Sequence, residues 1–224
     1  MNDFIRRNIF DRVRQYGFPS AIAQAFRALV RPVYRIDRNI VFIIPDFAGQ
    51  EFDDSLIRPI TRETIQEACR DGDLSPDEAR LLGGFLDEGS RGVHAEIDGR
   101  LAGYAWVQCE GEYRFGRTGR LTIPPKCAFT KYLFVLPQFR GRKLGQKLNA
   151  ARLALVPADR VPVVFIIPDN RYAIRNWEEY GFRPVLEVRQ SRWLGGRWKT
   201  RVTRLSECAK ADALLEAITE ASRG

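Results

Sequence analysis

The sequence predicts a mixed α/β fold, of the α+β kind, in which a twisted and mostly antiparallel sheet contains one central parallel crossover. Two hairpin patterns and one strand–helix–strand pattern support this prediction. Asp98-Gly99 and Gly195-Gly196 are dipeptides that favour tight turns between antiparallel strands. The strand-like segments that flank these turns are Val93–Ile97 with Leu101–Gln108, and Val185–Trp193 with Arg197–Leu205.

The crossover is expected in the middle of the chain, where Phe129–Leu136 has the pattern of a strand and Val161–Ile167 is almost wholly apolar. A nearly continuous apolar run is typical of a central parallel strand, because helices cover both of its faces. The intervening helix has an apolar face formed by Leu144, Leu148, Ala151 and Leu155. A strand, a helix and a second strand in this order form a right-handed βαβ unit.

The remaining elements follow from start and stop signals. Ser75 can cap a helix that has Pro76 at its first position and Glu78 three residues after the cap, and that ends near Gly89. Further helices are expected within 4–34 and at 61–70, 174–180 and 209–221, a short strand at 40–44, and a loop at 111–125. The chain is therefore divided into a basic helical extension (1–38), the main α/β domain (39–206) and a C-terminal helix (207–224).

The formal net charge of +8 is unevenly distributed along the 224 residues. Residues 1–38 contain eight Arg and three Asp, residues 39–99 five Arg and fourteen acidic residues, and residues 100–224 twenty-three basic and eleven acidic residues. A nucleic-acid-binding face would not require so acidic a middle segment, so no nucleic-acid partner is expected. The pattern fits an anionic ligand on one side and a cationic one on the other, or charge complementarity within the chain.

The few cysteines and the single histidine limit the chemistry that the chain can perform. The cysteines are far apart in sequence and lack C-x-x-C spacing, which favours small buried thiols in a reducing compartment over a disulfide framework or a zinc site. His94 is the only histidine, so neither a metal site nor a His-based triad is expected, and a structural role is favoured for it. No apolar run approaches the ~20 residues of a membrane span. We expect a cytoplasmic protein.

The segment Tyr132–Leu148 carries the strongest functional signal. It predicts an apolar strand, a proline-broken turn, a loop rich in glycine and arginine, and the start of a helix. The unpaired N–H groups and the positive dipole end of such a helix favour an anion, most often a phosphate. Gly141 and Gly145 allow a ligand to approach the backbone closely. The alternative is an ordinary strand-to-helix turn with a solvated basic rim.

Two motifs make the chain resemble the GNAT superfamily of N-acetyltransferases over roughly residues 40–205. The first is the arginine- and glycine-containing loop after a strand that ends in Val-x-Pro, here Val135–Gly145. The second is a strand followed by Asn, a short helix and Gly-Phe, here Ile166–Phe182. Both motifs occur in the expected order and about one helix apart.

The resemblance implies acetyl-CoA, or another acyl-CoA, as the cofactor. The loop amides would hold its pyrophosphate, the backbone around Phe134 and Val135 would pair with the pantetheine arm, and Asn170 and Arg175 would lie beside that arm. A backbone N–H there would also bind the thioester carbonyl as negative charge develops on it, an effect often worth ~3 kcal/mol per donor. The expected loop residues are Arg140, Gly141, Arg142, Lys143, Leu144, Gly145 and Gln146.

Three departures from the family pattern concern the loop and the proton-transfer groups. Lys143 replaces the first loop glycine, and its amide can still donate to phosphate. Trp177 replaces a tyrosine that many members use as general acid, and an indole cannot deliver a proton usefully. The strand Phe129–Leu136 lacks the carboxylate that some members use as base. The candidates for these catalytic roles are Tyr132, Tyr104 and Glu96 as proton acceptors, or a water chain, and Tyr180 or Tyr172 near Trp177.

The expected function is therefore an N-acyltransferase that moves an acetyl group from CoA to a primary amine by direct attack in a ternary complex. A longer acyl chain remains open. The alternative is a non-catalytic acyl-CoA sensor on the same fold.

Two groups of charged residues suit two kinds of acceptor. The acidic residues Asp46, Glu51, Asp53 and Asp54 would attract a protonated small-molecule or sugar amine, whereas Arg114, Arg117 and Arg120 would suit an anionic acceptor such as a nucleotide sugar. Residues 4–34 could pack on their own domain, form a homodimer or contact an anionic membrane surface.

Overall fold

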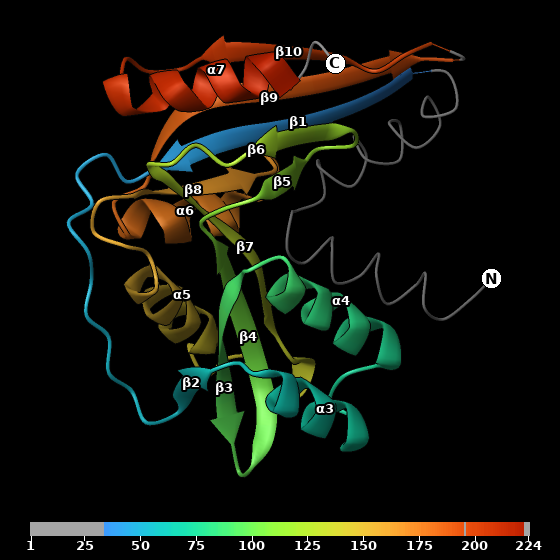
Figure 1. Ribbon diagram of the computed structural model, residues 1–224, viewed down its shortest axis with the longest axis vertical. Coiled ribbons are helices and arrows are strands. Elements are labelled where there is room, and N and C mark those ends of the chain that lie inside the picture. Colours follow the sequence, from blue (N-terminus) through green and yellow to red (C-terminus); the bar gives the residue numbers. More distant parts are fainter. Residues whose placement is uncertain (1–33, 195, 222–224) are drawn as a thin grey trace. The chain divides into compact units, whose positions relative to one another are not determined.

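The computed structural model describes residues 34–194 and 196–221, which divide into two compact units. The first unit contains the described residues up to Phe42, Arg114–Gly119 and the chain from Phe165 onward, and the second contains Ile43–Tyr113 and Arg120–Val164. Figure 1 shows the elements of both. The helices expected within 4–34 lie outside the described residues, so that expectation and the roles considered for this segment stay predictions.

The first unit is built on an antiparallel hairpin. Strands β9 (Arg183–Trp193) and β10 (Lys199–Arg204) pair antiparallel, and β1 (Tyr34–Ile43) is the other neighbour of β9. The ring of Tyr34 lies 4.8 Å from that of Trp193, and Arg38 forms a 2.7 Å ion pair with Glu187. Strand β1 therefore begins earlier than the segment 40–44 predicted from the sequence. The helices are α6 (Arg171–Glu179) and α7 (Asp212–Ala221), the latter preceded by the 3-10 turn η2 (Ala209–Ala211).

The second unit contains five neighbouring strands in the order β8-β7-β4-β3-β2. Their bounds are Ile57–Pro59 for β2, Arg91–Ile97 for β3, Arg100–Gln108 for β4, Cys127–Val135 for β7 and Val161–Ile166 for β8. The β2–β3, β3–β4 and β4–β7 pairs are antiparallel and the β7–β8 pair is parallel. The mixed, mostly antiparallel fold class and the central crossover are thus confirmed. The β3–β4 turn has positive φ at both Asp98 (52°) and Gly99 (72°), as a tight hairpin turn requires.

Helices cover both faces of this second-unit sheet (Figure 1). Helices α3 (Arg62–Arg70) and α4 (Pro76–Asp87) pack on the face that carries Tyr104 and Trp106. Helix α5 (Leu144–Ala154) packs on the opposite face, which carries Ala102 and Ala105. The Ser75 cap and its reciprocal hydrogen bond with Glu78 are present at the start of α4, as the sequence predicted.

The segment expected to be a loop at 111–125 forms a small two-stranded sheet instead, so that prediction was wrong. Its strands are β5 (Glu112–Phe115) and β6 (Gly119–Thr122). Alternate residues are buried, with Phe115 3% and Leu121 3% exposed. The intervening arginines and glycines hid this period-two pattern. Gly119 is required here, because a Cβ on it would lie 2.4 Å from the Phe115 ring.

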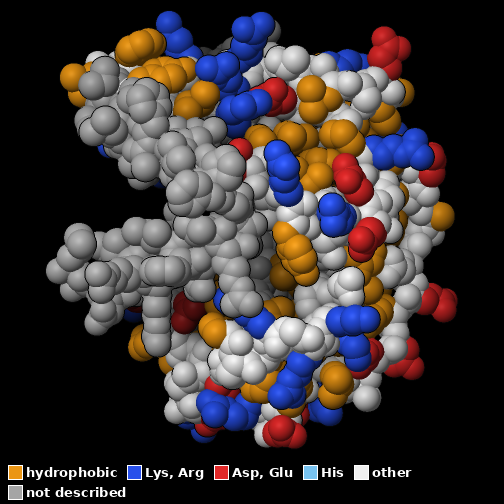
Figure 2. Space-filling view, turned by 180° about the vertical axis from the view of Figure 1, so that it is seen from behind, with side chains coloured by type: hydrophobic (Ala, Val, Ile, Leu, Met, Phe, Trp, Pro, Cys, Tyr) orange, Lys and Arg blue, Asp and Glu red, His pale blue; other side chains and the backbone are white. Residues whose placement is uncertain are grey.

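On the face shown in Figure 2, acidic side chains lie between basic ones. Exposed ion pairs include Arg62–Asp87 at 2.6 Å and Arg80–Asp77 at 2.8 Å. Among the described residues, none of the helices has the length and apolarity that a membrane crossing needs. All four cysteines are free thiols, and Cys127 is buried.

Candidate functional site

The loop between β7 and α5 presents an open helix N-terminus. The 3-10 turn η1 (Pro137–Phe139) follows β7, and the chain then turns through Gly141 (φ 85°) and Lys143 (φ 57°). Lys143 is the N-cap residue of α5, and its side chain makes no capping hydrogen bond. The Gln146 N–H donates to the Lys143 carbonyl at 3.1 Å, so the N–H groups ahead of it, on Leu144 and Gly145, are the ones that favour an anion together with the helix dipole.

Lys143 occupies the position at which the resemblance expects glycine, and the structure explains why glycine would suit it. Its backbone is left-handed, which costs a residue with a Cβ roughly 1–2 kcal/mol. The loop keeps the glycine-type conformation despite the substitution. The side chain of Lys143 is exposed and adds a positive charge beside the open N–H groups.

The basic side chains of the loop are engaged to different degrees. Arg140 donates from Nε to the carbonyl oxygen of Val135 at 3.2 Å, which ties the loop to the end of β7. Lys147 forms a 2.7 Å ion pair with Asp54, and its hydrogen bond is the main cause that holds the pKa of this carboxyl below its usual value. Arg142 is exposed. Asp54 therefore neutralises one of the cations in the first turns of α5.

The first turn of α5 leaves space above its backbone. Leu144 is 3% exposed and anchors the turn in the core, whereas Gln146 is exposed. A Cβ on Gly145 would meet only the Leu133 side chain, at 4.0 Å. This combination of a fixed helix start and an open glycine fits the pyrophosphate of a CoA molecule.

Strand β7 contains a bulge next to this loop. Tyr104 pairs with Phe134 and Trp106 pairs with Lys131, so Tyr132 and Leu133 together lie opposite the single residue Ala105. Tyr132 has φ 50°, which is uncommon for a bulky residue and marks local strain. Bulges leave the extra residue outside the ladder and are frequent next to active sites. The bulge lies just upstream of Phe134 and Val135, the residues expected to contact the thioester end of the cofactor.

Within the described residues, β8 pairs with only the first part of β7. The parallel register joins Cys127–Phe129 to Val161–Val163, and the Thr130 hydroxyl then donates to the Val163 carbonyl at 3.1 Å. A strand with unpaired backbone groups can accept another extended chain, and the amide-containing pantetheine arm has suitable groups. The pantetheine site expected along the backbone around Phe134 and Val135 stays a prediction.

Aromatic rings gather around the bulge on the α3–α4 face of the sheet. The ring of Tyr132 is stacked on Tyr104 at 6.4 Å and lies edge-on to Phe85 of α4 at 5.3 Å. Tyr104 also contacts Phe134, with ring centroids 5.8 Å apart. The structure thus brings together three of the predicted site residues, Tyr104, Tyr132 and Phe134.

The two tyrosines of this aromatic cluster differ in accessibility. Tyr132 is 49% exposed and Tyr104 is 1% exposed. Burial, with a smaller effect of Glu78, raises the pKa of Tyr104 well above its usual range. Tyr104 therefore stays protonated at physiological pH and is a poor proton acceptor, whereas Tyr132 can be reached from solvent.

A polar group that the sequence analysis missed lies beside the aromatic cluster. Lys131 donates from Nζ to Glu88 at 3.1 Å and to the Gln108 side-chain carbonyl at 2.8 Å, and Nζ lies 4.1 Å from the ring centre of Phe85. Its side chain is only 12% exposed, and this burial lowers its pKa while Glu88 opposes the effect. A carboxylate therefore lies beside β7, although it belongs to the residue that follows α4 and not to the strand itself. No local pattern could reveal this pairing, because 43 residues separate the partners.

The other predicted residues lie elsewhere. Glu96 is on β3 beside buried His94, with Oε2 4.0 Å from Nε2, and is not part of the aromatic cluster. Tyr180, Asn170 and Arg175 belong to the first unit, and their catalytic or binding roles stay predictions.

In that unit, the Asn170 side chain caps α6 by accepting from the Ala173 N–H at 3.1 Å. Arg175 is exposed on the same helix. The ring of Tyr180 lies 6.3 Å from Trp177, which is only 5% exposed. Among the described residues, no group of three or more His, Cys, Asp or Glu side chains could hold a metal ion.

Comparison with known proteins identifies the family. The model of the acetyltransferase (GNAT) family matches residues 58–182, more than half of the chain. This chain therefore belongs to the acetyltransferase (GNAT) family. No curated protein matches it.

Solved structures with the same fold include a GNAT-family acetyltransferase from Novosphingobium aromaticivorans, which is 21% identical with a TM-score of 0.51, over 77% of this chain and 66% of that one. A GCN5-related N-acetyltransferase-like protein from Streptococcus suis is 13% identical with a TM-score of 0.46, over 77% of this chain and 68% of that one. An aminoglycoside N-acetyltransferase in complex with CoA is 21% identical with a TM-score of 0.41, over 57% of this chain and 90% of that one. The chain spans 66% and 57% of the first two structures that it matches.

Proposed function

We propose that this protein is an N-acyltransferase that moves an acetyl group from acetyl-CoA to a primary amine. The observation that carries the proposal is the continuity of the bulged strand β7 with the open N-terminus of α5. One end of this segment suits a thioester and pantetheine arm, and the other end, at Gly141–Gln146, suits a pyrophosphate. The family membership supports the same reaction class.

In this proposal the chain acts mainly by positioning. A bound acyl-CoA supplies the activated acyl carbon. The bulge N–H groups of Tyr132 and Leu133 stabilise the negative charge that develops on the acyl oxygen, and such a donor is often worth ~3 kcal/mol. The amine nitrogen forms the new C–N bond as the C–S bond breaks. A protonated amine first gives one proton to solvent, and the second proton, which the nitrogen loses on attack, balances the proton gained by the sulfur.

The Glu88–Lys131 pair favours a cationic amine on the α3–α4 face. The side chain of Glu88 is 54% exposed, so its carboxylate can attract a protonated amine from solvent, while Lys131 holds it in place. We assign the return of a proton toward the leaving sulfur to Tyr132, whose ring is exposed in the neighbouring aromatic cluster.

Calorimetric titration with acetyl-CoA tests the donor site. We expect micromolar binding by the wild type and none by Gly145→Glu, which places a negative side chain in the open space at the loop. Gly84→Glu is a matched control, because a Cβ at Gly84 meets nothing within 4 Å and the residue lies in the middle of α4. Absence of wild-type binding, or equal binding by Gly145→Glu, would contradict the proposal.

Release of free thiol from acetyl-CoA with a set of amines separates an enzyme from a sensor. The buried Trp177 is the observation that favours the sensor, because no tyrosine hydroxyl occupies that position. Thiol release that depends on the amine supports the transferase. Binding without thiol release for any amine or acyl length supports an acyl-CoA-binding module instead.

A further inference from the structure

A buried arginine on α5 contacts the backbone of the bulge. Arg152 is 3% exposed, and its Nη1 donates to the carbonyl oxygen of Lys131 at 3.2 Å. Its Nη2 donates to the side-chain oxygen of Asn149, which is also 3% exposed. Burying a guanidinium removes it from water at a large cost, and an apolar side chain would fill the same space more cheaply. The position of its charge therefore calls for an explanation.

The carbonyl that Arg152 binds belongs to the peptide unit between Lys131 and Tyr132. The orientation of this peptide plane sets φ of Tyr132, the strained left-handed residue of the bulge. A strand residue would otherwise relax toward negative φ. By holding the carbonyl, the guanidinium holds the peptide plane and, with it, the bulge.

The same contact determines where the N–H of this peptide points. In a trans peptide the C=O and N–H point in opposite directions, and the structure has no cis peptide among its described residues. The Leu136 N–H donates to the Ala102 carbonyl, so the backbone groups of Ala102 point toward β7. Because these groups alternate in direction along a strand, those of Tyr104 and Trp106 also point toward β7. The backbone N–H and C=O groups of their partners Phe134 and Lys131 therefore point toward β4. The Tyr132 N–H, opposite the Lys131 carbonyl, is thus directed away from β4.

A positive charge on a peptide oxygen also makes the N–H of that peptide a stronger donor, because linked hydrogen bonds polarise one another at low dielectric. We propose that Arg152 is a positioning residue of the acyl-transfer site. It fixes and polarises the Lys131–Tyr132 peptide so that the Tyr132 N–H donates to the acyl oxygen. This inference rests on the proposed function and adds to it a residue on the opposite face of the sheet from the amine.

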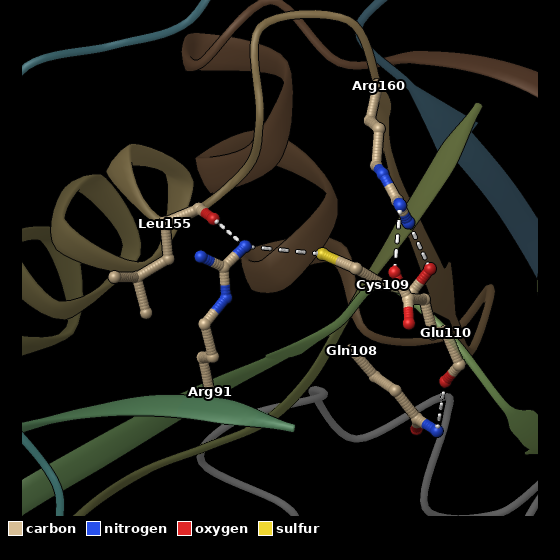
Figure 3. Close-up of polar contacts among 6 residues, drawn as sticks. All are labelled: Arg91, Gln108, Cys109, Glu110, Leu155 and Arg160. Atoms are coloured by element: carbon tan, nitrogen blue, oxygen red, sulfur yellow. Dashed lines mark hydrogen bonds and ion pairs between the residues drawn. The ribbon is translucent and has the colours of Figure 1, made fainter. Parts of the chain in front are cut away.

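Helix α5 is anchored at its far end independently of Arg152. Figure 3 shows Arg91 of β3 directed at the C-terminal end of this helix, where its Nη2 donates to the Leu155 carbonyl at 2.6 Å. Arg160 and Glu110 form a 3.2 Å ion pair nearby. Arg91 therefore supplies a matched control: it fixes the same helix by an arginine–carbonyl hydrogen bond but does not contact the bulge.

The test compares Arg152→Met, Arg152→Lys and Arg91→Met in the full chain. We expect Arg152→Met to lower kcat by at least about tenfold, because a weakened oxyanion donor acts on the transition state. Its affinity for CoA without an acyl group should change less than about twofold, since the loop is intact. Arg152→Lys should recover part of kcat, and Arg91→Met should lose stability with kcat per folded molecule unchanged.

Two results would overturn the inference: equal kcat losses in Arg152→Met and Arg91→Met, or a fall in CoA affinity that matches the fall in kcat. A crystal structure of Arg152→Met gives a readout without turnover. We expect φ of Tyr132 to become negative, and an unchanged positive φ would contradict the inference that Arg152 holds the bulge. If the wild type binds no acyl-CoA, the proposed function fails, while this φ still decides whether Arg152 holds the bulge.

Discussion

The ring of Tyr132 lies almost parallel to the ring of Tyr104, with an interplanar angle of 8° and centroids 6.4 Å apart. One tyrosine is half exposed and the other is buried, so the buried ring forms a fixed support for the accessible one. The left-handed backbone of Tyr132 turns its side chain out of the regular strand alternation and onto this support. The bulge therefore positions both a backbone donor and a phenol.

Removing the two hydroxyls should have different effects. We expect Tyr132→Phe to lower kcat by about tenfold or more, because a positioned general acid contributes at least that much. Tyr104→Phe should leave kcat within about twofold, since burial keeps its phenol protonated and away from solvent. Steady-state kinetics of both variants checks this. A larger loss in Tyr104→Phe than in Tyr132→Phe would contradict the assignment.

Lys143 allows backbone strain and charge to be separated. We expect Lys143→Gly to raise the free energy of unfolding by about 1 kcal/mol, because glycine adopts the left-handed conformation without the Cβ penalty. Lys143→Ala should bring no such gain, as alanine keeps the penalty. Urea denaturation measures the difference. Both variants should bind acetyl-CoA more weakly than the wild type if the lysine charge contributes to phosphate binding.

Gly103 of β4 allows a close approach of β7 at the site. A Cβ here would lie 2.7 Å from the Phe134 carbonyl oxygen and 3.2 Å from the Val135 Cα, both of which are backbone atoms. We therefore expect Gly103→Ala to lower the free energy of unfolding by about 1–3 kcal/mol.

Gly84→Ala is the control for this change, since its Cβ meets nothing within 4 Å and alanine favours a helix. This variant should be stabilised by up to about 1 kcal/mol. Thermal or urea unfolding of the two alanine variants checks both predictions. Equal stability of Gly103→Ala and the wild type would show that β4 and β7 can move apart at no cost.

The single histidine gives a clear expectation for the pH dependence of stability. Burial lowers the pKa of His94, with the nearby Glu96 opposing this effect, and its Nδ1 has no hydrogen-bond partner in the described structure. The unfolded chain therefore binds a proton more readily than the folded one. The stabilising contribution of neutral His94 is complete above the ordinary histidine pKa of about 6.5. It is lost as the pH falls through the lowered pKa of His94 in the folded state.

Urea unfolding at a series of pH values between about 7.5 and 5 measures this loss. His94→Gln removes the titrating group while keeping a polar side chain of similar length. The wild type should lose stability across this range, and the variant should show a smaller slope. Parallel slopes in the two proteins would show that other groups cause the effect.

Much of the second unit could be predicted because its signals are local. Asp98-Gly99 marked the β3–β4 hairpin, and the Ser75 capping box marked the start of α4. The apolar run at Val161–Ile166 marked the parallel strand β8. In each case a few adjacent residues determine the backbone conformation.

The features that complete the site depend on packing between distant segments. The bulge at Tyr132 arises from the register between β4 and β7, which no pattern within β7 reveals. The contact of Lys131 with Glu88 depends on where α4 ends above the sheet. The helical pattern of α5 identified its apolar face, yet Arg152 lies buried on that helix and donates to a strand carbonyl. Charged residues in a helical sequence are normally interpreted as solvent-exposed.

Helix α5 joins the two ends of the proposed donor site through one rigid element. Its first turn offers the open N–H groups at Gly145, and seven residues later Arg152 reaches the bulge. At about 1.5 Å per residue, the helix fixes an axial separation of roughly 10 Å between these two points. In the proposed binding mode, the phosphate contacts at Gly145 and the bulge at Tyr132 would be held apart by this segment of α5. The length of the segment would then determine which atom of the donor reaches the bulge.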